Sequence, residues 1–339
     1  MKSTFFSAVP FLASIASAAP VEVRQATNID TTVLQFALTL EHLENVFYKN
    51  ALTNFSQHDF EKAGYSKDYY NNLKYIAHDE EQHVLLLSGA LQNAGVTPNA
   101  ACAYSFPYTD VKSFITLSSV LEGVGTSAYL GGAPLITSKA YLTVAGSILV
   151  TEALHTSLQR LAVGEVPMAN PYGTPLDPTS AYTLAASFIL NCPAGNTALP
   201  FTPYPALTYT GNACTLEEPS GKISDLIKRN GWGKWGNGHQ GHNQCRAIAG
   251  GSTASFTAAS APPAGSYLTF VSGLSVTSVK GTINGNTISA PIPTVDEGQT
   301  YVFVSSKDVE GALDGTSVLF GPSIVEVAPQ PPAINYSVQ

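Results

Sequence analysis

The sequence predicts a mainly α-helical protein with a C-terminal β domain, in which four long helices and a shorter fifth one form a bundle and a small β-sandwich follows. Two patterns support this prediction. From about residue 30 to 190 apolar residues recur at helical spacing, whereas from about 250 to 327 short runs rich in Ser, Thr, Val, Gly and Pro alternate. With 339 residues, 44% of them hydrophobic, the chain is long enough for two domains with buried cores.

The boundaries of the elements follow from capping residues and prolines. Helices are expected at about 30–52, 66–93, 110–130, 134–163 and 178–190, and strands near 267–271, 300–304 and 317–327. Asp30 or Thr31 is expected to cap the first helix and Asp177 the fifth, with Pro134 at the start of the fourth.

The N-terminal residues have the pattern of a secretory signal. Lys2 is followed by an apolar stretch and then by the small residues Ala16, Ser17 and Ala18, which form a cleavage site. The stretch is shorter than the ~20 apolar residues that span a bilayer. We therefore expect a secreted protein, extracellular or in the cell wall, without a membrane span.

The expected division of the chain has five parts. These are a signal peptide at 1–18, a helical bundle at 28–192, a Pro/Gly-rich linker with a disulfide-closed loop at 193–249, a β-sandwich at 250–328 and a tail at 329–339.

Charged residues are sparse. They make up 12% of the chain, against roughly a quarter in typical soluble proteins. The 24 acidic and 16 basic residues give a net charge of -8, which argues against binding to nucleic acid or to anionic membranes. Metals, neutral substrates and carbohydrate remain as ligand classes.

Cysteine pairing is expected in a secreted chain. The four cysteines are Cys102, Cys192, Cys214 and Cys245. Of the three possible connectivities we favour Cys102–Cys192 with Cys214–Cys245, because the first ties two loops of one domain and the second closes a local loop. Asn54 and Asn335 begin sequons that are compatible with N-glycosylation.

Two long helices each carry a Glu-x-x-His motif. Glu80 and His83 lie on the second expected helix, and Glu152 and His155 lie on the fourth. Residues three apart in a helix are about 60° apart around its axis, so each pair can reach the same metal ion.

The other two long helices each carry a glutamate that is followed seven residues later by a tyrosine. These pairs are Glu41 with Tyr48 and Glu122 with Tyr129. Seven residues make nearly two turns, which places each tyrosine on the same face as its glutamate. The helical pattern sends all four glutamates into an apolar interior, where unpaired charges would cost several kcal/mol each. Two divalent cations would balance four carboxylates, with two neutral imidazoles as further ligands.

This arrangement resembles that of ferritin-like carboxylate-bridged two-metal proteins. The resemblance extends to a secreted fungal family that includes stress-responsive, desiccation-related and late sexual development proteins. It covers residues 30–190 and rests on residues 40–48, on the two Glu-x-x-His segments and on residues 121–125.

The resemblance implies roles for individual residues. The implied metal ligands are Glu41, Glu80, His83, Glu122, Glu152 and His155, with Glu80 and Glu152 as bridges and two iron or manganese ions as cofactors. Tyr48 and Tyr129 would donate hydrogen bonds to ligands, and Asp79 would orient a histidine. Thr151 replaces the corresponding aspartate of the second motif, so the two halves of the site are expected to differ in these outer contacts.

Several alternatives remain open at this stage. The six ligand positions could instead form a metal-free hydrogen-bonded network. Glu44, one turn from Glu41, is either an additional ligand or a partly solvated or hydrogen-bonded carboxylate. The two tyrosines are either packing donors or redox-active groups. Gly123 and Gly125 make room either for dioxygen, peroxide or a substrate beside Glu122, or for close helix packing.

Residues outside the helices give weaker indications of a functional site. His239 and His242 lie in a Gly-rich loop, which favours a solvated loop over a second metal site. Trp232 and Trp235 in the same loop could stack on sugar rings, so cell-wall carbohydrate is a possible partner.

Two functions from different classes are consistent with these features. The first is an oxidoreductase with two metal ions that acts on a small oxidant, dioxygen or peroxide, in stress or development. The second is a non-enzymatic stress or developmental protein of the cell surface, whose β domain binds the wall or a partner.

Overall fold

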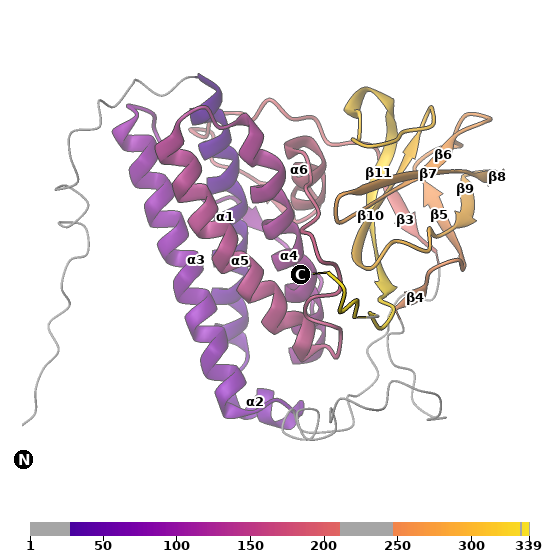
Figure 1. Cartoon of the computed structure of the whole chain (residues 1–339). Coiled ribbons are helices and arrows are strands. Elements are labelled where there is room, and N and C mark those ends of the chain that lie inside the picture. The colour runs from indigo at the N-terminus through magenta and orange to yellow at the C-terminus, as the bar shows by residue number, and fades with distance from the viewer. Residues whose placement is uncertain (1–27, 211–246, 333, 339) are drawn as a thin grey trace, which may run out of the picture.

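The computed structural model describes residues 28–210, 247–332 and 334–338. A helical bundle and a two-layer β-sandwich lie beside each other, with a short helix between them (Figure 1), which confirms the expected fold class. Three expected features lie outside the described residues: the signal peptide at 1–18, the Cys214–Cys245 pair, and the loop that holds both tryptophans, His239 and His242.

Four long helices form the bundle, and the remaining helices are short. The helices are α1 (Asn28–Asn54), α2 (Gln57–Lys62), α3 (Lys67–Asn93), α4 (Val111–Gly132), the 3-10 turn η3 (Ala133–Leu135), α5 (Lys139–Ala162) and α6 (Pro178–Ala186). Ser66, Asp110 and Asp177 accept hydrogen bonds from backbone N–H groups at the starts of α3, α4 and α6. Such caps satisfy donors that the helix itself leaves unpaired.

The expected start of the fourth helix at Pro134 is wrong. Pro134 lies in η3, Ile136 is extended, and α5 begins at Lys139 after Ser138, whose side chain accepts from Tyr141 N. A Ser cap supplies the acceptor that a proline lacks, so Ser138 was the better signal.

The expected cap of the first helix is also wrong. Because α1 begins at Asn28, Asp30 lies in its first turn, where it is buried. Its carboxylate accepts from the Thr137 backbone N–H at 2.6 Å and from the Thr137 hydroxyl at 2.7 Å. Asp30 thus fixes the loop before α5 to the start of α1.

The fifth helix ends earlier than expected because its last residues join a β-ribbon. After α6, strand β2 (Ile189–Asn191) pairs with β1 (Ala103–Tyr104) in antiparallel orientation. The expected disulfide between Cys102 and Cys192 is present at this ribbon. It links the middle of the segment between α3 and α4 to the end of the helical region.

Two sheets form the sandwich. The five-stranded sheet has the order β4 (Ile248–Ala249), β11 (Val318–Ala328), β10 (Gly298–Ser305), β6 (Tyr267–Ser272) and β7 (Ser275–Lys280). The four-stranded sheet has the order β3 (Leu207–Tyr209), β5 (Thr253–Ala258), β9 (Thr287–Pro291) and β8 (Thr282–Asn284). Strands β3 and β4 come from the expected linker at 193–249, so the sandwich uses more of the chain than the sequence pattern indicates.

The sandwich packs on the bundle as part of one core. Val271, Tyr301 and Phe303 belong to the same buried cluster as the aromatic residues of α1 and α3. The Tyr301 hydroxyl donates to Ser127 Oγ of α4 at 2.8 Å and lies 3.1 Å from the Gly123 carbonyl oxygen. The close approach depends on Gly123, because a Cβ there would lie 2.4 Å from Gln299 Oε1. Gly123 therefore allows close packing against Gln299 of strand β10, and not against another helix as one of the two alternatives expected.

A buried ion pair links the end of α5 to β11. The Arg160 guanidinium donates to both carboxylate oxygens of Glu326, at 3.0 and 2.6 Å, and lies 3.3 Å from Glu165. Arg160 itself is 4% exposed. A bidentate pair of this kind fixes orientation as well as distance.

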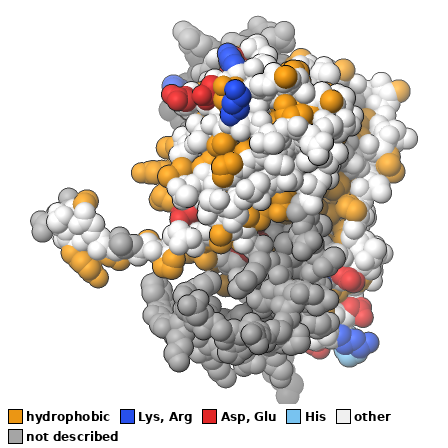
Figure 2. Space-filling model, turned by 90° about the vertical axis from the view of Figure 1, so that its right-hand side faces the viewer, with side chains coloured by type: hydrophobic (Ala, Val, Ile, Leu, Met, Phe, Trp, Pro, Cys, Tyr) orange, Lys and Arg blue, Asp and Glu red, His pale blue; other side chains and the backbone are white. Residues whose placement is uncertain are grey.

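One face of the described molecule carries few charged side chains (Figure 2). On the face in Figure 2, most side chains are uncharged, and the few acidic and basic ones gather in small groups near the edges. Within the described residues, no helix is both long and apolar enough to cross a membrane.

We predict that Glu326→Ala weakens the attachment of the sandwich. Arg160 would lose its bidentate partner while it stays buried, and Glu165 could replace only part of the interaction. The pair is more buried than a surface salt bridge but keeps some solvent contact, so we expect a loss of about 2 kcal/mol in the free energy of unfolding. Urea denaturation measures this loss, with Glu310→Ala at an exposed position as the matched control. Equal stability of the two variants would contradict the prediction.

Candidate metal centre

The six residues that the sequence singled out lie together in the centre of the bundle. They are Glu41 of α1, Glu80 and His83 of α3, Glu122 of α4, and Glu152 and His155 of α5. All four glutamates are 0% exposed, and the two histidines are 7% and 5% exposed. Each long helix thus contributes one carboxylate to the same buried point.

These residues form two groups of four that share two members. Glu41 and His83 form one group with Glu80 and Glu152, and Glu122 and His155 form the other with the same two glutamates. Within each group, one potential ligand atom per residue lies within 4.8 Å of the others. Two carboxylates are therefore common to both groups, as a pair of bridging ligands would be.

Each histidine turns Nδ1 towards the carboxylates. His83 Nδ1 lies 3.2 Å from Glu41 and 3.4 Å from both Glu80 and Glu152. His155 Nδ1 lies 2.9 Å from Glu80 and 3.3 Å from Glu122. The other nitrogen of His155, Nε2, lies 3.2 Å from Asp79 Oδ2, so Asp79 orients this ring from outside.

The two tyrosines cross over between helices. Tyr48 of α1 donates to Glu122 of α4, and Tyr129 of α4 donates to Glu41 of α1. The sequence placed each tyrosine on the face of its own glutamate but could not show that the hydroxyl reaches the glutamate of the other helix. Burial, followed by the negative charge of the glutamate that each one binds, raises the pKa of both tyrosines well above their ordinary value, so they remain donors.

A glutamine extends the hydrogen bonds beyond Tyr48. Gln159 is 0% exposed; its amide donates to Tyr48 at 3.2 Å and its carbonyl accepts from Tyr69 at 2.5 Å. The sequence alone indicated no role for Gln159 or Tyr69. The available signal was the position of Gln159, four residues after His155 on the ligand face of the helix.

Glu44 is a fifth buried carboxylate at the edge of the cluster. It is 4% exposed, and its Oε2 has no hydrogen-bond partner. A Cβ at Gly125 would lie 2.9 Å from Glu44 Oε1 and 2.6 Å from Glu152 Oε2. Gly125 therefore makes room for the carboxylates themselves, and Glu44 is buried beside them.

Burial sets the protonation of the carboxylates. Burial raises the pKa of Glu80 to about 7, although the nearby imidazoles of His155 and His83 oppose the rise. Burial and then the charge of neighbouring glutamates raise the pKa values of Glu44 and Glu152. Glu41 differs: burial alone would raise its pKa, but the hydrogen bond and charge of His83 lower it.

The carboxylates have the opposite effect on the histidines. Burial alone would lower the pKa of both rings. The neighbouring carboxylates of Glu152, Glu41 and Glu80 instead raise the pKa of His83, and the negative charge of Glu122, together with that of Glu80, raises the pKa of His155 to about 12. The cluster therefore attracts positive charge strongly, either as protons or as metal ions.

Unpartnered buried atoms make the cluster fit for metal ions. Besides Glu44 Oε2, the cluster atoms without a hydrogen-bond partner are both carboxylate oxygens of Glu80, both of Glu152, Oε2 of Glu122 and Nδ1 of His155. Buried polar atoms are normally paired, so this group needs an explanation. Carboxylate and imidazole donors that point to one place suit divalent cations.

The remaining predicted positions lie at the surface or outside the described residues. Asn54 and Asn335 are both exposed, so the two sequons are accessible. The loop with His239 and His242 lies outside the described residues.

Part of the chain is similar to known proteins. Residues 29–165 match the family described as a ferritin-like domain. Protein rds1 of Schizosaccharomyces pombe is 30% identical over 183 residues, which are 53% of this chain and 44% of that protein. The chain thus spans less than half the length of this relative. A solved structure of a conserved hypothetical protein, rv2844, from Mycobacterium tuberculosis is 16% identical, with a TM-score of 0.34, and the match covers 40% of this chain and 91% of that one.

We predict that the protein stripped of metal loses stability as the pH rises from 5 to 8. A carboxyl group with a raised pKa in the folded state stabilises the fold below its unfolded pKa, and this contribution is lost as the pH rises through the folded value. For Glu80, a change from 4.5 to about 7 corresponds to about 3 kcal/mol. The raised pKa values of His83 and His155 act in the same direction above pH 6.5, whereas the lowered pKa of Glu41 acts only below pH 4.5.

Urea denaturation at several pH values in the presence of a chelator measures this slope. Glu80→Gln, which removes the titrating group and preserves its volume, should flatten it. A free energy of unfolding that stays constant between pH 5 and 8 in the stripped wild-type protein would contradict the prediction.

Proposed function

Because residues 29–165 form a ferritin-like domain, as the motifs predicted, we propose that this chain binds two iron or manganese ions in the bundle and acts as an oxidoreductase on dioxygen or hydrogen peroxide. The observation that carries the proposal is the set of unpartnered carboxylate oxygens and one imidazole nitrogen at a single buried point.

Each residue has a definite part in this proposal. Glu41 and His83 would hold one ion, Glu122 and His155 the other, and Glu80 and Glu152 both. Four carboxylates match the charge of two divalent ions, so binding would replace the protons that otherwise balance the cluster.

The protein would contribute positioning and exclusion of water. The two ions would supply one-electron redox chemistry and a place for an oxygen ligand. Tyr48 and Tyr129 hold Glu122 and Glu41 in place, and Asp79 holds His155. The four glutamates have no solvent contact, which strengthens every electrostatic interaction among them.

Secretion belongs to the same proposal. The Cys102–Cys192 disulfide supports it, because disulfides persist mainly in oxidising compartments. The expected signal peptide at 1–18 and the sequons at Asn54 and Asn335 agree with export. A role in stress or development follows only from the resemblance to the fungal family, and we include it as part of the proposal.

The non-enzymatic alternative uses the sandwich as a wall-binding or partner-binding module. Its largely uncharged surface (Figure 2) suits a neutral carbohydrate. Pull-down on chitin and glucan distinguishes the two proposals: retention that survives replacement of the six cluster residues, together with no turnover of either oxidant, would favour this alternative.

We predict two metal ions per chain in the protein purified after addition of Fe(II) or Mn(II). Glu80→Gln should lower the content by at least one ion, because Glu80 belongs to both groups of ligand atoms. His78→Gln, at an exposed position on the same helix, should leave the content unchanged. Elemental analysis measures the metal, and circular dichroism verifies that both variants are folded.

The same samples test the chemistry. We expect consumption of dioxygen in the presence of Fe(II), or breakdown of hydrogen peroxide, by the wild-type protein and by His78→Gln but not by Glu80→Gln. A folded wild-type protein that retains no metal after reconstitution would refute the proposed function.

A further inference from the structure

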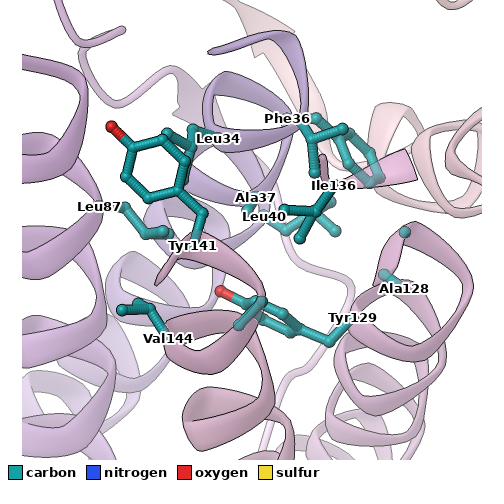
Figure 3. Close-up of a pocket in the computed structure, with 13 residues that line it drawn as sticks. Leu34, Phe36, Ala37, Leu40, Leu87, Ala128, Tyr129, Ile136, Tyr141 and Val144 are labelled. Carbon is teal, nitrogen blue, oxygen red and sulfur yellow. The ribbon is translucent and has the colours of Figure 1, made fainter. Parts of the chain in front are cut away.

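An apolar pocket opens at the end of the bundle where α5 begins. Residues of α1, α3, α4 and α5, together with Ile136 of the loop before α5, line it (Figure 3). The space between its atoms, including the open mouth, amounts to about 460 Å³. Much of this space is open solvent, and the enclosed part, about 30 Å³, has room for a molecule the size of water or of a diatomic gas.

The pocket lies next to the candidate metal centre. Ala37 precedes Glu41 by one turn of α1, and Leu87 follows His83 by one turn of α3. Tyr129 lines the pocket and donates its hydroxyl proton to Glu41. One side chain therefore touches both the pocket and a carboxylate of the cluster.

The walls of the pocket have almost no hydrogen-bonding groups for water. All thirteen lining residues are uncharged, and the only side-chain polar groups among them are the hydroxyls of Tyr129 and Tyr141. The Tyr129 proton is committed to Glu41, and the Tyr141 hydroxyl points away from the centre of the pocket (Figure 3). A buried water needs two to four polar partners, whereas apolar cavities stay dry and accept apolar gases.

A second, polar route to the cluster lies at the two histidines, away from the apolar pocket. Among the six cluster residues, only His83 of α3 and His155 of α5 keep some exposure, and the Asp79 side chain beside His155 is 39% exposed. Hydrogen-bonding molecules would find partners on this side. The cluster therefore has a polar approach and an apolar one.

We propose that the apolar pocket is the binding and entry site for dioxygen, which reaches the cluster past Tyr129. The reaction of this dioxygen at the cluster rests on the proposed function, whereas the binding of a small apolar gas in the pocket is independent of it. Hydrogen peroxide, which needs hydrogen bonds, enters by the histidine side.

Xenon tests the binding directly, because it is apolar and similar in size to dioxygen. Crystals of the full chain under xenon pressure are expected to show the gas between Ala37, Leu87 and Tyr129. Ala145→Phe places a large side chain in the pocket and should exclude the gas. Ala37→Leu is a second filling variant in case the first does not fold. Ala153→Phe, at an exposed position on the same helix, is the matched control and should retain it.

Kinetics with the two oxidants test the consequence. In metal-loaded protein, Ala145→Phe should lower kcat/KM for dioxygen at least fivefold, through KM, and change kcat/KM for hydrogen peroxide by less than twofold. The metal content should equal that of the wild-type protein. Ala153→Phe should match the wild-type protein with both oxidants.

Each outcome decides the proposal. Xenon absent from the wild-type pocket, an unchanged KM for dioxygen in a variant that excludes xenon, or equal loss with both oxidants would overturn it. If the wild-type protein turns over neither oxidant, the proposed function fails, and the xenon experiment alone decides whether the pocket binds small apolar molecules.

Discussion

Mutual repulsion of buried carboxylates is the constraint on which the rest of this structure depends. Four glutamates without solvent contact meet at one point, and Glu44 adds a fifth at its edge. Such a group is stable only if positive charge enters it or protons remain on it. The raised pKa values of Glu80 and Glu152 mean that these carboxylates retain protons, and the raised pKa values of both histidines mean that the rings retain positive charge. The same imbalance that weakens the stripped protein would provide the affinity for cations.

The outer parts of the molecule hold this charged centre in place. Tyr48 and Tyr129 cross between α1 and α4, so each helix positions the carboxylate of the other. The sandwich also holds α4, because the hydroxyl of Tyr301 and the amide of Gln299 bind this helix near Gly123, the residue after Glu122. Arg160 adds a bidentate link from α5 to β11. The β domain is therefore a structural support of the bundle rather than a tethered appendage.

The helix pattern explained most of the bundle in advance. Ser66, Asp110 and Asp177 marked helix starts because a side-chain acceptor is a local property. Errors arose where distant contacts decide: Asp30 binds Thr137 rather than capping α1, and residues after α6 pair with β1 rather than continuing the helix. Strands β3 and β4 were missed for another reason: two or three residues carry too little periodicity to identify a strand.

The sequence by itself determined which residues share a face: spacing of three, four and seven places Glu41, Glu80, His83, Glu122, Glu152 and His155 on inward faces of four helices. Only the tertiary structure decided what those faces meet. Four features depend on how the helices and the sandwich pack against one another. They are the hydrogen bonds of the two tyrosines across helices, the space at Gly123 and Gly125, the hydrogen bonds of Gln159 and the apolar pocket beside Tyr129. Helical periodicity fixes angles within one element, whereas the distances between elements arise from packing across the whole core.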